Sequence, residues 1–300
     1  MLLKKNIMKI SKHITIAGQS KSPIQVSRLG YGTMRLTGEG IYGEPANRPE
    51  ALQILKQAIK SGVNFIDTAD YYGEDVTNRL ISEALHPYSE ELIICSKVGG
   101  ARKPDKSWIG FNTPANIRTS IENNLKTLRL DQMALVHFRV MPGSKVPFEE
   151  SMEAMFELQQ EGKILHVGVS NVDRPELETA LKMGKIATVE NMYGHGQRTT
   201  IKAHYGDTRG GEEVLDLCEL NEIPLIPFFS LLNSLGKKDN RISTIAQKYG
   251  ATDAQINIAW LLHRSPWILP IPGTSTLNHF EENMKAAYIN LTIEDMEFLN

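Results

Sequence analysis

Cysteine is scarce in this sequence, which has only Cys95 and Cys218 among its 300 residues. The two lie far apart and form neither a CxxC pair nor the spacing of a metal site. This excludes the disulfide-rich class of small secreted proteins and predicts no metal centre. The two residues are expected to be reduced thiols, with one buried disulfide between them as the alternative.

Long apolar runs and blocks of one charge are also missing. No segment reaches the roughly 18 consecutive apolar residues that a membrane-spanning helix needs. Lys and Arg number 33 and Asp and Glu 35, a net charge of −2 without a long run of either sign. Neither a nucleic acid nor a membrane surface is therefore expected as a partner. Residues 1–8 are too short and too charged for a signal peptide, so we expect a cytoplasmic protein. The sequence does not indicate an oligomeric state.

Glycine-rich phosphate loops are absent as well, because neither GxGxxG nor GxxxxGK[ST] occurs. A doubly wound open sheet that binds a nucleotide needs such a loop after an early strand. What the sequence does contain is a regular alternation of short β-branched runs with amphipathic stretches, which is typical of parallel strands joined by crossover helices. Eight such strands, each followed by a helix, predict an α/β protein with one domain over residues 1–300, a (β/α)8 TIM barrel.

The expected elements begin with an N-terminal β-hairpin, residues 13–18 and 24–28, around a turn-rich segment. The barrel strands are expected at Leu29–Gly32, Val63–Asp67, Leu92–Lys97, Ala134–Arg139, Ile164–Ser170, Thr188–Met192, Ile223–Phe228 and Ile268–Pro272. The helices are expected at Glu50–Ser61, Asn78–Leu85, Pro114–Leu128, Phe148–Glu161, Arg174–Met183, Gly211–Leu220, Ile242–Tyr249, Asp253–Leu262 and Asn278–Ala287.

Polar side chains collect where the predicted strands end, which is the end of such a barrel that carries the active site. Asp67 ends the second strand, Lys97 ends the third, and His137 lies near the end of the fourth. Tyr72 follows Asp67 in the run Asp-Thr-Ala-Asp-Tyr-Tyr-Gly. Neighbouring strands are about 4.8 Å apart, so these four side chains can meet.

Each of these residues also has a simpler interpretation. Asp67 could cap the helix that follows. Lys97 could be a solvated surface residue, although it ends the otherwise apolar run 92–96. His137, taken alone, is as readily a hydrogen-bonded core histidine. The simpler interpretation is the less favoured one for Asp67 and Lys97, whereas His137 by itself does not favour a catalytic role.

The order and spacing of these residues resemble the aldo-keto reductases. The similarity extends from Leu29–Thr33 to Ile271–Ser275 and Glu281–Asn283. The resemblance implies a catalytic tetrad of Asp67, Tyr72, Lys97 and His137. It also selects Tyr72 over its neighbour Tyr71, which is expected to pack beside the pocket.

The chemistry implied by this tetrad is proton donation to a carbonyl oxygen. A phenol has a pKa of about 10 and is a poor acid at neutral pH. The Lys97 ammonium is expected to lower the pKa of Tyr72, and Asp67 is expected to keep Lys97 charged and oriented. His137 is expected to donate a hydrogen bond to the substrate carbonyl, so that the developing alkoxide is stabilised from two sides.

The resemblance further implies a nicotinamide cofactor, NADPH or its oxidised form NADP+, with a phosphate at the start of the last helix. Two departures bear on this. Gly273 and His279 stand where several family members have Lys and Arg, and Glu190 stands where the family more often has Gln. Phe229 is expected to form an aromatic wall, and the short loop 231–240 predicts no long segment over the cofactor. The expected cofactor-binding residues are Gly32, Thr33, Met34, Asp67, Ser170, Asn171, Glu190, Phe228, Phe229, Ser230, Leu231, Gly273, Thr274, Ser275, His279, Glu282 and Asn283.

Two functions follow as hypotheses. The favoured one is an enzyme that reduces a small aldehyde or ketone, and the alternative is a dinucleotide-binding redox sensor or regulatory subunit with little turnover. Loops 34–45, 99–111 and 139–145 are expected to shape the pocket. Their indole and cations, from Trp108, Arg35, Arg102, Lys103 and Arg139, suit a planar polar aldehyde better than a sterol. Residues 262–275 also resemble bacterial family members that interconvert pyridoxal and pyridoxine, which makes pyridoxal a candidate substrate.

Overall fold

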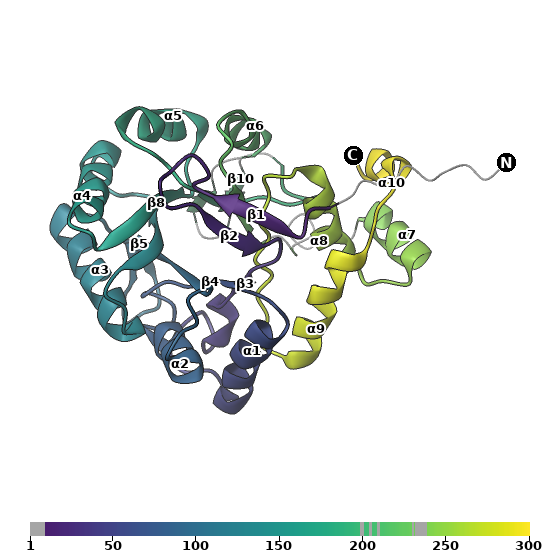
Figure 1. The fold of residues 1–300 in the computed structure, drawn as a ribbon, viewed down its shortest axis with the longest axis horizontal. Helices are drawn as coiled ribbons and strands as arrows, with labels where there is room; N and C mark the ends of the chain where they lie inside the picture. The colour runs from purple at the N-terminus through teal and green to yellow at the C-terminus, as the bar shows by residue number, and fades with distance from the viewer. Residues whose placement is uncertain (1–9, 199–200, 204–205, 209–210, 230, 232–238) are drawn as a thin grey trace.

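Parallel strands alternate with helices along the chain, and the strands curve into a ring with the helices outside it (Figure 1). The computed structural model describes residues 10–198, 201–203, 206–208, 211–229, 231 and 239–300. The order of the strands in the sheet is β12-β9-β8-β7-β5-β4-β3, and each of these neighbouring pairs is parallel. This is the predicted (β/α)8 arrangement.

The described elements agree with most of the predicted ones to within a few residues. The strands are β1 His13–Ile16, β2 Ile24–Ser27, β3 Tyr31–Gly32, β4 Phe65–Asp67, β5 Ile93–Arg102, β6 Trp108–Phe111, β7 Met133–Arg139, β8 Ile164–Ser170, β9 Val189–Met192, β10 Ile201–Ala203, β11 Gly206–Thr208 and β12 Leu225–Phe228. The helices are η1 Met34–Leu36, α1 Arg48–Lys60, α2 Val76–Leu85, α3 Pro114–Leu128, α4 Phe148–Gln160, α5 Arg174–Met183, α6 Glu212–Leu220, α7 Asn240–Tyr249, α8 Asp253–Arg264, α9 Leu277–Lys285, η3 Ala286–Tyr288 and α10 Ile293–Leu299. None of the helices in this described part is long and apolar enough to cross a membrane.

The ring closes through residues 267–271, where the sequence predicted a regular eighth strand. One parallel bridge joins Ile268 to Leu225, and the Leu269 N–H donates to the Leu225 carbonyl at 2.9 Å. On the other side, the Gly30 N–H donates to the Pro270 carbonyl at 2.9 Å. Pro270 and Pro272 have no N–H and cannot complete a ladder of strand hydrogen bonds. The segment therefore occupies the eighth position without being a regular strand, which corrects the prediction for Ile268–Pro272.

The N-terminal hairpin closes one end of the barrel. β1 and β2 pair antiparallel, as the sequence predicted, and one face of the hairpin presents Ile14, Ile16, Ile24 and Val26. These side chains pack with inward-facing residues of the barrel: Phe65, Cys95, Leu135, Ala187, Ile226, Leu269 and Ile271. Figure 1 shows the hairpin lying across the middle of the ring. The other end of the barrel is left for a site.

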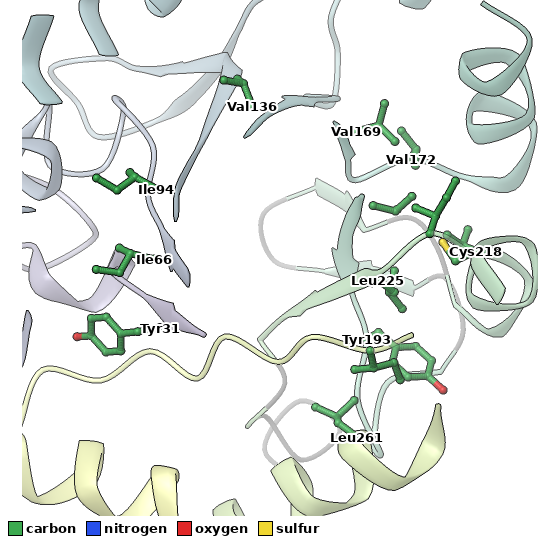
Figure 2. Close-up of a cluster of buried hydrophobic side chains, with 14 of the residues drawn as sticks. Tyr31, Ile66, Ile94, Val136, Val169, Val172, Tyr193, Cys218, Leu225 and Leu261 are labelled. Carbon is green, nitrogen blue, oxygen red and sulfur yellow. The ribbon is translucent and has the colours of Figure 1, made fainter. Parts of the chain in front are cut away.

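The main hydrophobic core lies between the strands and the outer helices. Successive residues of a strand face opposite sides, so Ile66 and Ile94 belong to this outer core while Phe65 and Cys95 face the barrel interior. Figure 2 shows the outer set on successive strands, with Tyr31, Ile66, Ile94, Val136, Val169 and Leu225 among its members. The same alternation directs every second residue of each strand into the barrel, and this is how polar side chains of the strands come to face its interior.

Local signals in the sequence fix the helix ends. The Thr113 side chain accepts a hydrogen bond from the Asn116 N–H, and Pro114 stands in the first turn of α3. Asp173 and Glu176 form a capping box at the start of α5. Gly162 follows α4 with a φ of 78°, in the left-handed region that favours glycine.

The sequence did not indicate β6, the β10–β11 pair or α10. β5 runs past the barrel to Arg102, and its extension pairs antiparallel with β6 from Gly99 to Arg102. This arm brings Trp108 beside Tyr71, with ring centroids 5.7 Å apart. A β-ribbon of this kind depends on pairing with a partner strand, and its own sequence showed no clear alternation.

Candidate active site

The strand register brings the predicted catalytic residues together at the end of the barrel opposite the hairpin. Asp67 is the last residue of β4, and the parallel register pairs it with Cys95 on β5. Lys97, two residues further along β5 on the same face, pairs with His137 on β7. The three side chains therefore point into the same end of the barrel, as the sequence predicted from the strand ends.

Lys97 lies between two carboxylates. It is fully buried, and its Nζ lies 2.5 Å from Asp67 Oδ1 and 3.3 Å from Glu190 Oε1. Burial lowers the pKa of Lys97, but Asp67 and Glu190 outweigh this effect and hold the pKa well above its ordinary value. The ammonium thus remains charged inside the protein. Removing either carboxylate would leave its buried charge less well compensated.

Glu190 makes this a group of three charges, which we call the Lys97 cluster: Lys97, Asp67 and Glu190. Burial and the charge of Glu190 raise the pKa of Asp67 to about 8, against the opposing effect of Lys97. Two carboxylates compete for one ammonium, and with a pKa of about 8 Asp67 still binds a proton near neutral pH. The Lys97 cluster then carries no net charge.

His137 lies inside the barrel beside Glu190 and is fully buried. Its Nε2 is 2.7 Å from Thr188 Oγ1, and its Nδ1 is 3.2 Å from Glu190 Oε2. A Cβ on Gly168 would lie 2.4 Å from the ring, so only glycine leaves room for it. Burial lowers the pKa of His137 to about 4, which keeps the imidazole neutral. Glu190 Oε2 has no hydrogen-bond partner among the described residues, although Nδ1 is near.

Tyr72 lines the main cavity at this end of the barrel, together with Asp67 and Glu190. The Lys97 Nζ is 5.1 Å from the centre of the Tyr72 ring. Burial raises the pKa of Tyr72 above its ordinary value, and Lys97 offsets this only in part. The prediction that Lys97 lowers the pKa of Tyr72 into the working range is therefore wrong as a net effect, because desolvation of the phenolate is the larger influence.

About half of the expected cofactor-binding residues surround this cavity. It is lined by Gly32, Met34, Asp67, Asn171, Glu190, Phe228, Phe229, Leu231 and Gly273 from that set, together with Arg35, Ile41, Tyr71, Tyr72, Trp108, Arg139, Met141, Pro142 and Ile271. Thr33 and Ser170 are buried behind its wall, where Thr33 Oγ1 donates to the Asp67 carbonyl and Ser170 Oγ accepts from Arg139. Ser230 lies outside the described residues, as does most of the loop expected to be short.

Two glycines form part of the cavity wall. A Cβ on Gly32 would lie 2.8 Å from the Ile271 carbonyl, and one on Gly273 would lie 2.7 Å from the Gly32 carbonyl. Both positions therefore require glycine, and both leave bare backbone at the cavity wall. Asn171 has a φ of 58° and follows Ser170 at the end of β8, so that both residues lie next to Glu190.

Residues 274–283, the proposed phosphate site, surround the start of α9 and do not line the main cavity. Thr274 and Asn283 are buried, while Ser275 and His279 are exposed. The Glu282 side chain accepts a hydrogen bond from Thr252. The first N–H of α9, at Leu277, donates to the carboxylate of Glu50 at 3.2 Å. A carboxylate from α1 at this helix end was not foreseen, because nothing local in the sequence marks such a contact.

The loops expected to shape the pocket contribute unequally. Arg35, Trp108 and Arg139 line the cavity, whereas Arg102 and Lys103 do not. The Arg102 guanidinium lies 4.1 Å from the centre of the Trp108 ring and donates to backbone carbonyls of the loop after η1. Tyr71, expected to pack beside the pocket, is part of its wall.

Comparison with known proteins assigns the chain to one family. The profile of the Aldo/keto reductase family matches residues 28–300. The chain belongs to this family.

Individual relatives agree with that assignment. The chain is 40% identical over 280 residues to the pyridoxine 4-dehydrogenase of Escherichia coli, which covers 92% of this chain and 94% of the relative. A thermostable aldo-keto reductase crystallised with the inhibitor epalrestat is 30% identical, with a TM-score of 0.78 over 97% of this chain and 98% of that one. An aldo-keto reductase from Klebsiella pneumoniae crystallised with NADPH is 25% identical, with a TM-score of 0.74 over 97% and 94% of the two chains. The predicted family and the (β/α)8 fold are confirmed.

Proposed function

We propose that this protein reduces an aldehyde or ketone to an alcohol with NADPH as its cofactor. The observation that carries the proposal is the buried Lys97, paired with Asp67 and Glu190 beside Tyr72 in the cavity. Burying an ammonium and its carboxylate partners costs desolvation free energy, so this arrangement contributes little to stability. Beside a phenol, however, the ammonium stabilises the phenolate that forms when the phenol gives up its proton. Membership of the aldo/keto reductase family and the NADPH complex of the Klebsiella pneumoniae structure support the cofactor.

In this proposal Tyr72 is the proton donor. When bound, the nicotinamide supplies a hydride to the carbonyl carbon. The carbonyl oxygen becomes an alkoxide, which is a far stronger base than a phenolate, so the Tyr72 O–H bond breaks and its proton forms the alcohol O–H. Lys97 stabilises the phenolate that remains. Asp67 and Glu190 keep Lys97 protonated throughout.

His137 has a different role in this proposal from the predicted hydrogen bond to the carbonyl. Its ring does not line the cavity, and Thr188 and Glu190 face its two nitrogens. Nδ1 also lies 3.2 Å from Cys95 Sγ. We propose that His137 is a positioning residue, whose ring packs against Glu190 beside Lys97. The readout for this role is the pH profile of turnover, which a residue that only filled space would not shift.

The remaining cofactor contacts are proposed as follows. Asn171 and Glu190 would hold the carboxamide, with Phe228 and Phe229 as aromatic walls, whereas Ser170 lies behind the wall with its hydroxyl bonded to Arg139. Gly32, Thr33, Met34, Leu231 and Gly273 would lie along the cofactor, and Thr274, Ser275, His279, Glu282 and Asn283 would surround its adenosine phosphate at the start of α9.

Pyridoxal is the first substrate to test, because the Escherichia coli relative is named for oxidation of pyridoxine. The experiment follows NADPH consumption by the purified protein across aldehydes that include pyridoxal, with Tyr72→Phe as the control. Turnover that depends on Tyr72 supports the proposal. Tight NADPH binding without turnover of any aldehyde would support the redox sensor or regulatory subunit instead.

We further propose that residues 1–300 form one domain and that the protein works in the cytoplasm. The main core supports the first point, since it joins residues from Tyr31 to Leu299. Cys95 and Cys218 support the second, since both are free and buried, which also removes the alternative of a disulfide between them.

A further inference from the structure

One polar group in the cavity wall has no role in the reaction described above. Tyr71 is 5% exposed and lines the cavity, yet its hydroxyl has no hydrogen-bond partner among the described residues. Buried hydroxyls are nearly always paired, because an unpaired one loses its hydrogen bonds to water and gains nothing in return. A phenylalanine would pack here without that loss. The hydroxyl is therefore placed for a ligand.

Tyr71 is held in one orientation by its neighbours. Its ring meets Tyr72 edge to face at 5.4 Å and Trp108 at 5.7 Å, with interplanar angles of 88° and 84°. Burial raises the pKa of Tyr71 well above its ordinary value, so the hydroxyl keeps its proton. It can donate a hydrogen bond to an acceptor in the cavity from a fixed position.

Arg139 brings a positive charge to the same wall. It is the last residue of β7, and it lies two residues beyond His137 on the same face of the strand. Its Nη1 donates to Ser170 Oγ at 3.2 Å, and its guanidinium lies 4.9 Å from the centre of the Phe228 ring. The charge of Arg139 is the strongest influence that lowers the pKa of Tyr71, so the two groups act on the same space.

The charges around the cavity leave Arg139 uncompensated. The only described carboxylates that line it are Asp67 and Glu190, and both belong to the Lys97 cluster. That cluster carries no net charge when its carboxylates share one proton. Arg139 and Arg35 then give the cavity a positive potential, and the planar rings of Trp108 and Phe228 border it.

We propose that Tyr71 and Arg139 form an anion subsite that selects flat aldehydes with an anionic oxygen, a phenolate or a carboxylate, on the ring that bears the carbonyl. The inference rests on the proposed carbonyl reductase function and names its substrate class. Tyr71 donates one hydrogen bond to the anionic oxygen, and the Arg139 guanidinium supplies the charge and a second donor. Tyr72 acts on the carbonyl oxygen of the same substrate.

The test is a ratio of kcat/KM values measured with NADPH on one protein preparation. The numerator is the kcat/KM for a charged aldehyde. This is either a carboxybenzaldehyde isomer or a hydroxybenzaldehyde isomer at a pH where its hydroxyl is ionised. The denominator is benzaldehyde. A second pair compares pyridoxal with pyridine-4-carbaldehyde. Comparison of the carboxybenzaldehydes with the hydroxybenzaldehydes shows whether carboxylate or phenolate is the preferred anion. Because both values of each ratio come from one protein preparation, any loss of folded protein cancels.

Wild-type protein is expected to give a ratio above about 10 for at least one isomer, as for one charge-assisted hydrogen bond or more. Tyr71→Phe and Arg139→Met should each reduce that ratio about tenfold. Tyr88→Phe and Arg174→Met are the matched controls, because Tyr88 bonds to the Leu128 carbonyl and Arg174 pairs with Glu178, both outside the cavity. Both controls should keep the wild-type ratio.

Two results would overturn the inference while the proposed function stands. One is a wild-type ratio near one for every isomer, with benzaldehyde still reduced. The other is a high ratio that survives in both Tyr71→Phe and Arg139→Met. Failure of the wild-type protein to reduce any aldehyde would instead contradict the proposed function itself.

Discussion

Replacing Glu190 by glutamine tests whether two carboxylates share one proton around Lys97. The folded protein holds the pKa of Asp67 at about 8, well above the ordinary value of 3.8, because of burial and Glu190. A folded pKa above the unfolded one means that the folded state binds the extra proton. The resulting stability is fully present below pH about 4 and is lost as the pH rises towards 8.

The informative window is pH 6.5 to 8.0. His137 has a folded pKa of about 4, below the ordinary 6.5, so its contribution is lost as the pH falls through 6.5 towards 4 and approaches its full value above 6.5, in the wild type and the variant alike. Each pH unit over which one proton is bound only by the folded state changes stability by about 1.4 kcal/mol. Allowing for partial release near pH 8, Asp67 should account for a loss of about 1.5 kcal/mol across the window.

In Glu190→Gln the pKa of Asp67 should fall, because Lys97 then faces a single carboxylate. The loss of stability between pH 6.5 and 8.0 should be smaller than in the wild type by about 1 kcal/mol. Asp70, whose pKa burial also raises to about 8, contributes the same loss to both proteins and cancels in the comparison. Urea unfolding followed by tryptophan fluorescence at the two pH values measures the difference.

Glu153→Gln is the control, since it removes an exposed carboxylate from α4 and should behave as the wild type. If Glu190→Gln loses as much stability over the window as the wild type, burial alone raises the pKa of Asp67 and the proton is not shared with Glu190.

Three further predictions concern turnover and cofactor binding. Tyr72→Phe should lower kcat about 100-fold or more and leave NADPH binding nearly intact, so retention of more than about 10% of kcat would show another proton donor. Lys97→Met should change the pH dependence of the residual turnover, and Asp67→Asn should do so more weakly; unchanged pH profiles in both would break the chain from Asp67 to Tyr72. His279→Ala should weaken NADPH binding up to about tenfold with little effect on NADH, while Glu50→Gln should strengthen NADPH binding a few-fold, because its carboxylate lies at the start of α9. Fluorescence titration with both cofactors measures these affinities, and equal effects on NADPH and NADH would contradict the phosphate site.

The pattern of the sequence was enough to identify the barrel and the end of it that carries the site. Strand and helix periods are local properties, and the carboxyl ends of parallel strands meet at one edge whatever the loops do. The strand ends alone therefore put Asp67 and Lys97 side by side, whereas the choice of Tyr72 over Tyr71 came from the resemblance to the aldo-keto reductases. The regular eighth strand was the main error, since Pro270 and Pro272 limit the hydrogen bonds that the segment can make.

Contacts between distant segments were decided only by the tertiary structure. Glu190 joins Lys97, and Glu50 reaches the start of α9, through the closure of the barrel, and no local pattern encodes either distance. The depth of burial was equally hidden, and it turned the predicted fall in the pKa of Tyr72 into a rise. His137 turns towards Thr188 because Gly168, on the neighbouring strand, leaves space for its ring. Sequence spacing specifies which residues share a face, whereas register, burial and the space left by a neighbour specify what each of them touches.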